Sequence, residues 1–123
     1  MMGGMARRSG CPCGLPAEYE DCCGRLHRGE AAPTAEALMR SRFSAFAVGD
    51  VGYLLRTWHP ATRPESLELE SSLRWVRLEV LEAAGRTVRF AAHYVDAGGP
   101  GVLREHSRFV RDGDGWLYVG PMS

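Results

Sequence analysis

With 123 residues, 45% of them hydrophobic and 24% charged, the chain has the composition of one globular domain with a small appendage. Fifteen basic and fifteen acidic residues leave a formal net charge of +0 at pH 7, which excludes a global electrostatic attraction to DNA or to anionic membranes. No run approaches the roughly 20 apolar residues of a membrane span, and the N-terminus carries no apolar signal segment. We therefore expect a cytoplasmic protein.

All four cysteines of the chain lie in one short stretch near its N-terminus. Cys11 and Cys13 form a Cys-x-Cys pair, and Cys22 and Cys23 form a vicinal pair further along. Tetrahedral zinc accepts four thiolates at about 2.3 Å each, and a short loop with one helical turn can present them in this way. The spacing therefore predicts a zinc knuckle over residues 11–28 that holds one structural zinc ion.

Two disulfide bonds are the alternative use of four cysteines in a short chain. The expected cytoplasmic location keeps thiols reduced, and a bond between Cys22 and Cys23 would join Cα atoms that lie closer than disulfide geometry usually allows. Zinc is therefore the favoured interpretation. His27 follows the second pair closely and is a further candidate ligand that could compete with a cysteine.

The chain divides into three parts. Residues 1–10 are expected to be a flexible N-terminus, residues 11–28 form the knuckle, and residues 34–123 form the main domain. Within the main domain a helical period comes first, and from Leu73 onward the period of apolar residues changes to two. Helices followed by a run of strands are typical of the α+β class.

Two helices are expected at the start of the main domain. Thr34 is suited to an N-cap, residues 35–48 run without a breaker, and Gly49 suits the C-terminal end of that helix. Residues 50–58 predict a second helix, which the His-Pro dipeptide that follows would end, since the residue before proline avoids the helical region. Residues 65–72 could form a third, short helix.

The second half of the main domain predicts an antiparallel meander. Val76, Leu78 and Val80 alternate with other residues, as in a strand with one buried face. Three glycine-containing turns separate the expected strands, at residues 84–86, 98–101 and 112–115. A cone of helices packed on a curved antiparallel sheet usually encloses a cavity, which is the default ligand site.

Four motifs after the knuckle resemble those of a known family. They are Leu38-Met39-Arg40-Ser41-Arg42-Phe43-Ser44-Ala45-Phe46, Tyr53-Leu54, Thr57-Trp58-His59-Pro60 and Glu105-His106-Ser107-Arg108-Phe109. In this order they are similar to the YchJ family of bacterial proteins of unassigned function. The resemblance covers nearly the whole chain and implies a SEC-C zinc motif followed by a nuclear transport factor 2-like (cystatin-like) domain. It also implies a set of metal ligands, Cys11, Cys13, Cys22 and Cys23.

A polar group is expected inside the cavity. Strand alternation places Glu105 and Ser107 on the same face as apolar neighbours, where a carboxylate must find a partner. Arg40 or Arg42 would supply it, either in a buried ion pair that fixes helix to sheet or in a substrate site. His59 could act as an acid or base at the cavity mouth, or could only cap a helix end. The candidate pocket residues are Arg40, Tyr53, Trp58, His59, Glu105 and Ser107.

Two classes of function fit this sequence. The first is a binding or adaptor protein whose knuckle contacts a protein or ribonucleoprotein partner and whose cavity holds a small ligand. The alternative is an enzyme that uses His59 and Glu105 as acid-base groups. We prefer binding, because four thiolates close the zinc shell and leave no position for a reacting water. The oligomeric state is open, and a dimer is possible.

Overall fold

Helices precede strands along the chain, as the change of period predicts. The computed structural model describes residues 10–122, so the expected flexible segment 1–10 lies almost wholly outside the described residues. The elements are the 3-10 turn η2 (Tyr19–Asp21), α1 (Cys23–His27), α2 (Ala35–Val48), α3 (Val51–Arg56), β1 (Arg74–Ala84), β2 (Thr87–Asp96), β3 (Gly99–Asp112) and β4 (Gly115–Pro121).

Helix α2 spans the residues that the sequence predicts. Oγ1 of Thr34 accepts a hydrogen bond of 3.0 Å from the backbone N–H of Ala37, which is the expected N-cap. At the other end Gly49 has a φ of 83°, and its N–H donates to the carbonyl of Ala45. Only glycine takes this left-handed conformation without strain, so the helix stops there. Local signals therefore fix both ends of α2.

Helix α3 starts where expected but ends early. The Asp50 carboxylate accepts a backbone hydrogen bond from the first turn, and the last helical residue is Arg56. Beyond it the chain pairs with β4: the N–H of His59 donates to the carbonyl of Tyr118, and the N–H of Tyr118 donates to the carbonyl of Thr57, each at 2.8 Å. Pairing with a distant strand thus replaces the last turn of the predicted helix.

The short helix predicted at residues 65–72 is absent from the structure, which describes all of that segment. Leu67 and Leu69 are both partly buried against the core, while the residues between and beside them are exposed. In an extended chain residues two apart share a face, whereas in a helix they point about 200° apart. The extended form therefore lets both leucines reach the core, which the helix would not.

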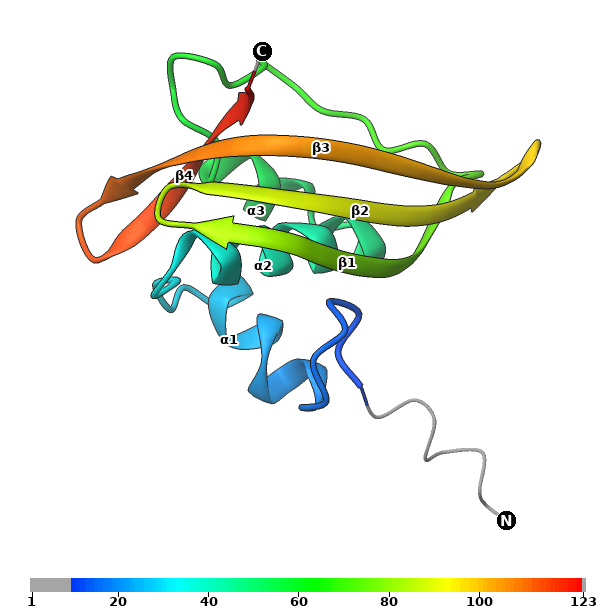
Figure 1. Cartoon of the computed structure of the whole chain (residues 1–123), viewed down its shortest axis with the longest axis horizontal. Coiled ribbons are helices and arrows are strands. Elements are labelled where there is room, and N and C mark those ends of the chain that lie inside the picture. Colours follow the sequence, from blue (N-terminus) through cyan, green and yellow to red (C-terminus); the bar gives the residue numbers. More distant parts are fainter. Residues whose placement is uncertain (1–9, 123) are drawn as a thin grey trace.

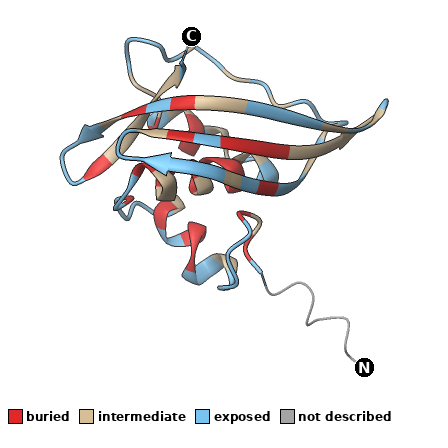
Figure 2. Ribbon diagram, in the orientation of Figure 1, coloured by how far each residue is buried: buried red, intermediate tan, exposed pale blue. Residues whose placement is uncertain are grey.

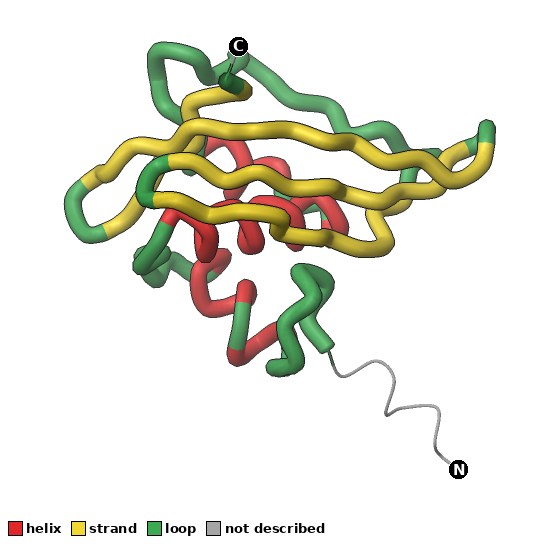
Figure 3. The backbone as a smooth tube through the Cα atoms, viewed as in Figure 1, coloured by secondary structure: helices red, strands yellow, loops and turns green. Residues whose placement is uncertain are grey.

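The four strands form one antiparallel sheet in the order β1-β2-β3-β4. Gly85 and Gly113 occupy the tight turns after β1 and β3 with φ of 60° and 61°, the left-handed region that two-residue hairpin turns require. Figure 1 shows the long curved strands lying over the helices, and the tube in Figure 3 traces the same meander. The α+β fold class is therefore as predicted.

Strand β1 contains a bulge that alternation alone does not reveal. The pairing with β2 is irregular between Trp75 and Arg77, so Val76 is an extra residue. Trp75 packs against the core, as does Leu78, whereas Val76 is 56% exposed. The expectation that Val76 shares the inner face is wrong, because the extra residue shifts the alternation by one position.

The chain is arranged in layers. The sheet lies on one side, α2 and α3 pack beneath it, and the N-terminal segment with α1 lies beyond the helices (Figure 1). The buried residues concentrate where the sheet and α2 face each other, and a second buried group lies in the N-terminal segment (Figure 2). Helix α2 thus has a packing partner on both sides.

No helix within residues 10–122 is long and apolar enough to cross a membrane.

Candidate metal centre and adjoining cavity

The four cysteines converge on one point. One sulfur from each residue lies within 4.8 Å of all the others, and the Sγ atoms of Cys13 and Cys22 are 3.7 Å apart. A disulfide would need about 2.05 Å, and all four thiols are free. A tetrahedron with its corners about 2.3 Å from the centre has edges of about 3.8 Å, so the donor set and its spacing suit a tetrahedral metal ion.

The thiols are packed so tightly that they control one another's ionisation. Each cysteine is 9% exposed or less. Hydrogen bonding from Cys13 holds the pKa of Cys11 far below its ordinary value, whereas hydrogen bonding to Cys11 raises the pKa values of Cys13 and Cys23. Without a cation, the protonated forms of Cys13 and Cys23 are thus favoured. A divalent cation would let these thiols release their protons, as metal binding to cysteines requires.

The loop that carries the first pair is shaped by backbone hydrogen bonds. The N–H of Cys11 donates to the carbonyl of Ala17 at 2.9 Å, and the N–H of Gly14 donates to the carbonyl of Cys11 at 3.0 Å. Gly14 has a φ of 101°, which a side chain would strain. The second pair lies where η2 meets α1: Cys22 is the N-cap of α1 and Cys23 is its first residue. The local backbone conformation therefore positions both cysteine pairs.

The cysteine cluster is docked firmly on α2. Oγ of Ser44 lies 3.5 Å from Sγ of Cys11, and both atoms are buried. Nη1 of Arg40 donates to the carbonyl of Cys13 at 2.9 Å, while its Nε bonds Glu36 at 3.0 Å. A serine hydroxyl and an arginine from one face of α2 therefore hold the first cysteine loop in place.

His27 lies beside the cluster but is occupied elsewhere. Its Nε2 is 2.8 Å from the carbonyl of Ser41, and its Nδ1 is 2.6 Å from the hydroxyl of Tyr19. A carbonyl only accepts, so Nε2 carries the proton and Nδ1 accepts from the tyrosine. Both ring nitrogens are thus engaged, and the histidine ties α1 to α2 instead of competing for the metal position.

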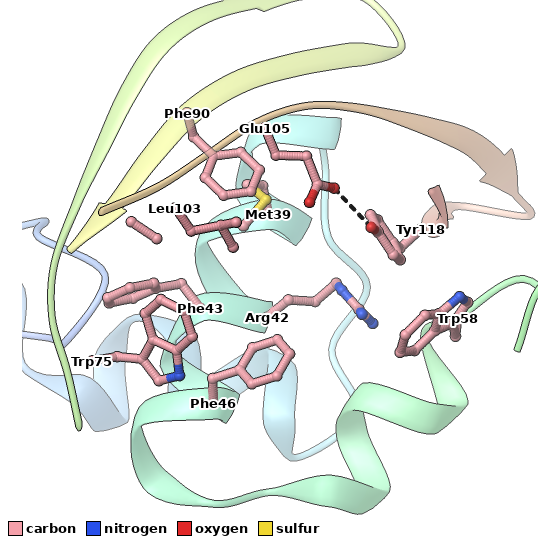
Figure 4. Close-up of a pocket in the computed structure, with 11 residues that line it drawn as sticks. Met39, Arg42, Phe43, Phe46, Trp58, Trp75, Phe90, Leu103, Glu105 and Tyr118 are labelled. Carbon is pink, nitrogen blue, oxygen red and sulfur yellow. Dashed lines mark hydrogen bonds between the residues drawn. The ribbon is translucent and has the colours of Figure 1, made fainter. Parts of the chain in front are cut away.

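A cavity of about 120 Å³ opens on the other side of α2, between that helix and the sheet (Figure 4). Aromatic and aliphatic side chains line most of it, and the charged groups gather at one end. The lining residues are Met39, Arg42, Phe43, Phe46, Trp58, Trp75, Phe90, Ala92, Leu103, Glu105 and Tyr118.

At the polar end, Glu105 is held by hydroxyl groups. Its Oε2 accepts from Oγ of Ser107 at 2.6 Å and from the hydroxyl of Tyr118 at 2.8 Å, and Figure 4 shows the second of these bonds. The expected ion pair with Arg40 or Arg42 does not form among the described residues. The expectation is wrong for a physical reason: two hydroxyls from the sheet itself, those of Ser107 and Tyr118, bind one oxygen of the carboxylate in place of an arginine.

Arg42 is buried with an unusual set of neighbours. Its Nη1 donates to the carbonyl of Leu54 at 2.8 Å and to Oγ1 of Thr57 at 2.7 Å. The guanidinium carbon lies 4.4 Å from the ring centre of Tyr118 and 5.0 Å from that of Trp58, within cation-π range. Burial lowers the pKa of Arg42 to about 10, so the group stays charged at neutral pH.

The structure separates the candidate pocket residues. Trp58 and Glu105 line the cavity, and Ser107 bonds Glu105 from a fully buried position. The other three do not line the cavity and lie elsewhere: Arg40 at the cysteine loop, Tyr53 between Ser41 and His27, and His59 beside β4.

Sequence reasoning did not single out the apolar residues that line the cavity, and it missed Tyr118, which bonds Glu105 at the polar end. Tyr118 lies in β4 two positions after Trp116, so alternation could have placed both on the inner face of the sheet.

One buried tyrosine, Tyr53, and one partly buried tyrosine, Tyr118, make the fold sensitive to alkali. Burial raises the pKa values of Tyr53 and Tyr118, and the hydrogen bond to Glu105 adds to the rise at Tyr118. Below about pH 10 folded and unfolded phenols are both protonated, so the stabilisation is fully present. Above that pH the unfolded chain ionises first, and the free energy of unfolding falls as pH rises.

We therefore expect phenolate absorbance and loss of far-ultraviolet circular dichroism to develop together in an alkaline titration. Phenolate absorbance from all the tyrosines near their ordinary pKa of about 10, with the fold intact, would contradict this assignment.

Comparison with known proteins assigns the chain to a family. Residues 34–121 match the family described as the YchJ, middle NTF2-like domain. A UPF0225 protein of Streptomyces coelicolor is 53% identical over 117 residues, which cover 89% of this chain and 91% of the relative. A UPF0225 protein of Xanthomonas oryzae is 50% identical over 117 residues, with the same coverage of 89% and 91%.

Two solved structures share the fold. The solution structure of a SEC-C motif containing protein from Rhodopseudomonas palustris has a TM-score of 0.79 and 30% identity, and the match covers 92% of this chain and 97% of that one. The crystal structure of a SEC-C motif containing protein from Psychrobacter arcticus has a TM-score of 0.73 and 28% identity, with coverage of 92% and 83%. With its four-cysteine cluster and its helices under a four-stranded sheet, the chain belongs to the UPF0225, or YchJ-like, family.

Proposed function

We propose that this protein is a zinc-stabilised binding module. The cysteine cluster holds one structural zinc ion, the knuckle around it contacts a protein partner, and the cavity under the sheet receives a small ligand. The observation that carries the proposal is the closed set of four buried thiols, fixed to the same helix that forms a wall of the cavity.

Zinc is the ion that best suits this donor set. Thiolates are soft ligands that favour zinc or iron-sulfur clusters over magnesium or calcium, and zinc takes them without a change of redox state. The 3.7 Å spacing of Cys13 and Cys22 sulfurs fits a single ion. Four protein ligands fill a tetrahedral shell, so the ion supports the fold and does not activate water.

Binding fits the cavity better than catalysis does. Acid-base chemistry needs two titratable groups within reach of one substrate. His59 does not line the cavity beside Glu105, and its Nδ1 accepts from the N–H of Ala61 at 3.0 Å. Among the described residues, the acid-base pair of the enzyme alternative is therefore not assembled.

The knuckle surface favours a protein partner over a ribonucleoprotein. Leu15 is 40% exposed at the tip of the first cysteine loop, and three nearby acidic residues, Glu18, Glu20 and Asp21, are exposed. Carboxylates repel the phosphates that dominate affinity for nucleic acid. An apolar tip beside acidic groups instead suits a protein surface with an apolar pocket and a basic rim.

The zinc assignment is tested by native mass spectrometry with three forms of the chain. We expect one zinc ion per chain. The Arg40→Met variant should lose zinc to a chelator about tenfold faster than the wild-type protein does, because it lacks a group that orients the cysteine loop around the ion. Arg25→Met is the matched control, because Arg25 makes only an exposed ion pair with Glu30. A metal-free protein, or equal rates for both variants, would contradict the assignment.

The partner surface is tested by quantitative cross-linking of the zinc-loaded protein in cell extract. We expect Leu15→Asp to reduce partner yield several-fold, because it places a charge in an apolar contact, and ribonuclease to leave the yield unchanged. Val48→Asp is the control, since Val48 is 52% exposed at the end of α2 and not in the knuckle. Yields that survive Leu15→Asp, or that disappear with ribonuclease, would overturn this part of the proposal.

A further inference from the structure

The polar end of the cavity contains a cation without an ion-pair partner. Arg42 is only 3% exposed, and no carboxylate of residues 10–122 forms an ion pair with it. A buried charge is costly unless it is paired and hydrogen-bonded. The rings of Tyr118 and Trp58 offset part of that cost but supply no hydrogen-bond acceptor in this geometry.

Arg42 also has donors to spare. Nη1 makes both of its hydrogen bonds, so within the described chain Nε and Nη2 make none. Within residues 10–122, the side-chain nitrogen and oxygen atoms that have neither solvent access nor a hydrogen-bond partner are the indole nitrogens of Trp58 and Trp116. Nε and Nη2 of Arg42 are not among them, so these unpaired donors keep some access to open space. A guanidinium with unused donors facing an open volume is ready to bind an acceptor.

Glu105 offers the complementary group at the same end. Its Oε2 accepts from two hydroxyls, whereas no described residue donates to Oε1. Glu105 and Arg42 both line the cavity, and Figure 4 shows their charged groups on the side of the cavity where Tyr118 and Trp58 lie. The polar end thus presents free donors and a free acceptor, and the positive and negative charges cancel.

The rest of the cavity sets the size and shape of the ligand. The rings of Phe43, Phe46, Trp75 and Phe90 line it, and Phe43 and Phe46 meet Trp75 with centroids 6.0 and 5.9 Å apart. A closed cavity of about 150 Å³ holds one benzene ring. This cavity, of about 120 Å³, is partly open to solvent, so a single flat ring with a small substituent can enter it without being fully enclosed.

We propose that the cavity binds a small, uncharged, planar ligand with a primary carboxamide at its polar end. This deepens, and rests on, the proposed role of the cavity as a ligand site. The amide carbonyl accepts from Nε or Nη2 of Arg42, its NH₂ donates to Oε1 of Glu105, and the flat apolar body lies among the aromatic rings. A carboxylate ligand would be repelled by the negative charge of Glu105, and an ammonium ligand would be repelled by the positive charge of Arg42.

The test uses the zinc-loaded protein of residues 1–123 with four probes that share one phenyl ring and differ in its substituent: benzamide, benzoate, benzylammonium and toluene. The readout is the side-chain N–H signal of each tryptophan in a nitrogen-proton correlation spectrum. Trp58 and Trp75 line the cavity and Trp116 does not, so Trp116 is an internal control. We expect benzamide to give saturable shifts at Trp58 and Trp75 only, and to bind more tightly than the other three.

Two variants change the charge at the polar end in opposite directions. Glu105→Gln leaves the arginine unopposed, so the preference should move toward benzoate. Arg42→Met should weaken benzamide about tenfold, the usual loss for a hydrogen bond to a charged group, and move the preference toward benzylammonium. Glu82→Gln is the matched control, because its side chain is 64% exposed on β1 and pairs weakly with Arg89.

Each possible result either supports the carboxamide assignment or overturns it. The expected order and both changes of preference support the carboxamide assignment, and Glu105→Gln alone suffices if Arg42→Met does not fold. Saturable binding of all four probes with equal affinity overturns the assignment but leaves the cavity as a ligand site. Benzoate or benzylammonium as the tightest wild-type probe overturns it in favour of a charged ligand. No shift at Trp58 or Trp75 with any probe overturns both this inference and the proposed cavity role.

Discussion

The structure depends on the packing of helix α2, which contacts the cysteine segment on one side and the sheet on the other. Side chains of α2 at positions 40 and 44 face the N-terminal segment, where they contact the cysteine loop. The backbone carbonyl of Ser41 also meets His27 of that segment. Side chains at positions 39, 42 and 43 line the cavity under the sheet. A helix with packing partners on both sides is held by each of them, so the metal site and the cavity share a wall. An ion bound at the cysteine cluster would therefore stabilise more than the short segment that ligates it.

The burial of Arg42 shows how the cavity end of this helix is built. A guanidinium is less strongly hydrated than an ammonium and stacks on aromatic faces, which explains why arginine can occupy a nearly dry position between Tyr118 and Trp58. Its Nη1 also donates a hydrogen bond to the carbonyl of Leu54, near the end of α3. The same side chain thus joins α2, α3 and β4, and it still keeps donors directed at the cavity. In our proposal, the structural role of Arg42 and its binding role coincide in one residue.

Much of the fold follows from local sequence signals, and the parts that do not follow depend on distant contacts. The ends of α2 could be predicted because Thr34 and Gly49 act within their own helix. The bulge at Val76 and the early end of α3 could not, because each depends on a partner strand far along the chain. Alternation placed Glu105 correctly on the inner face, yet it says nothing of which group satisfies the carboxylate. Arg40 and Arg42 lie two residues apart on a helix, about 200°, so one sequence motif serves two separate sites.

The most direct test of this shared wall is hydrogen-deuterium exchange of the protein with zinc and after its removal. If the cluster supports α2 from the side opposite the sheet, loss of zinc raises exchange along α1 and α2, while the paired centres of β2 and β3 stay protected. Unchanged exchange in α2 would show that the cysteine cluster is an independent appendage and would contradict the account.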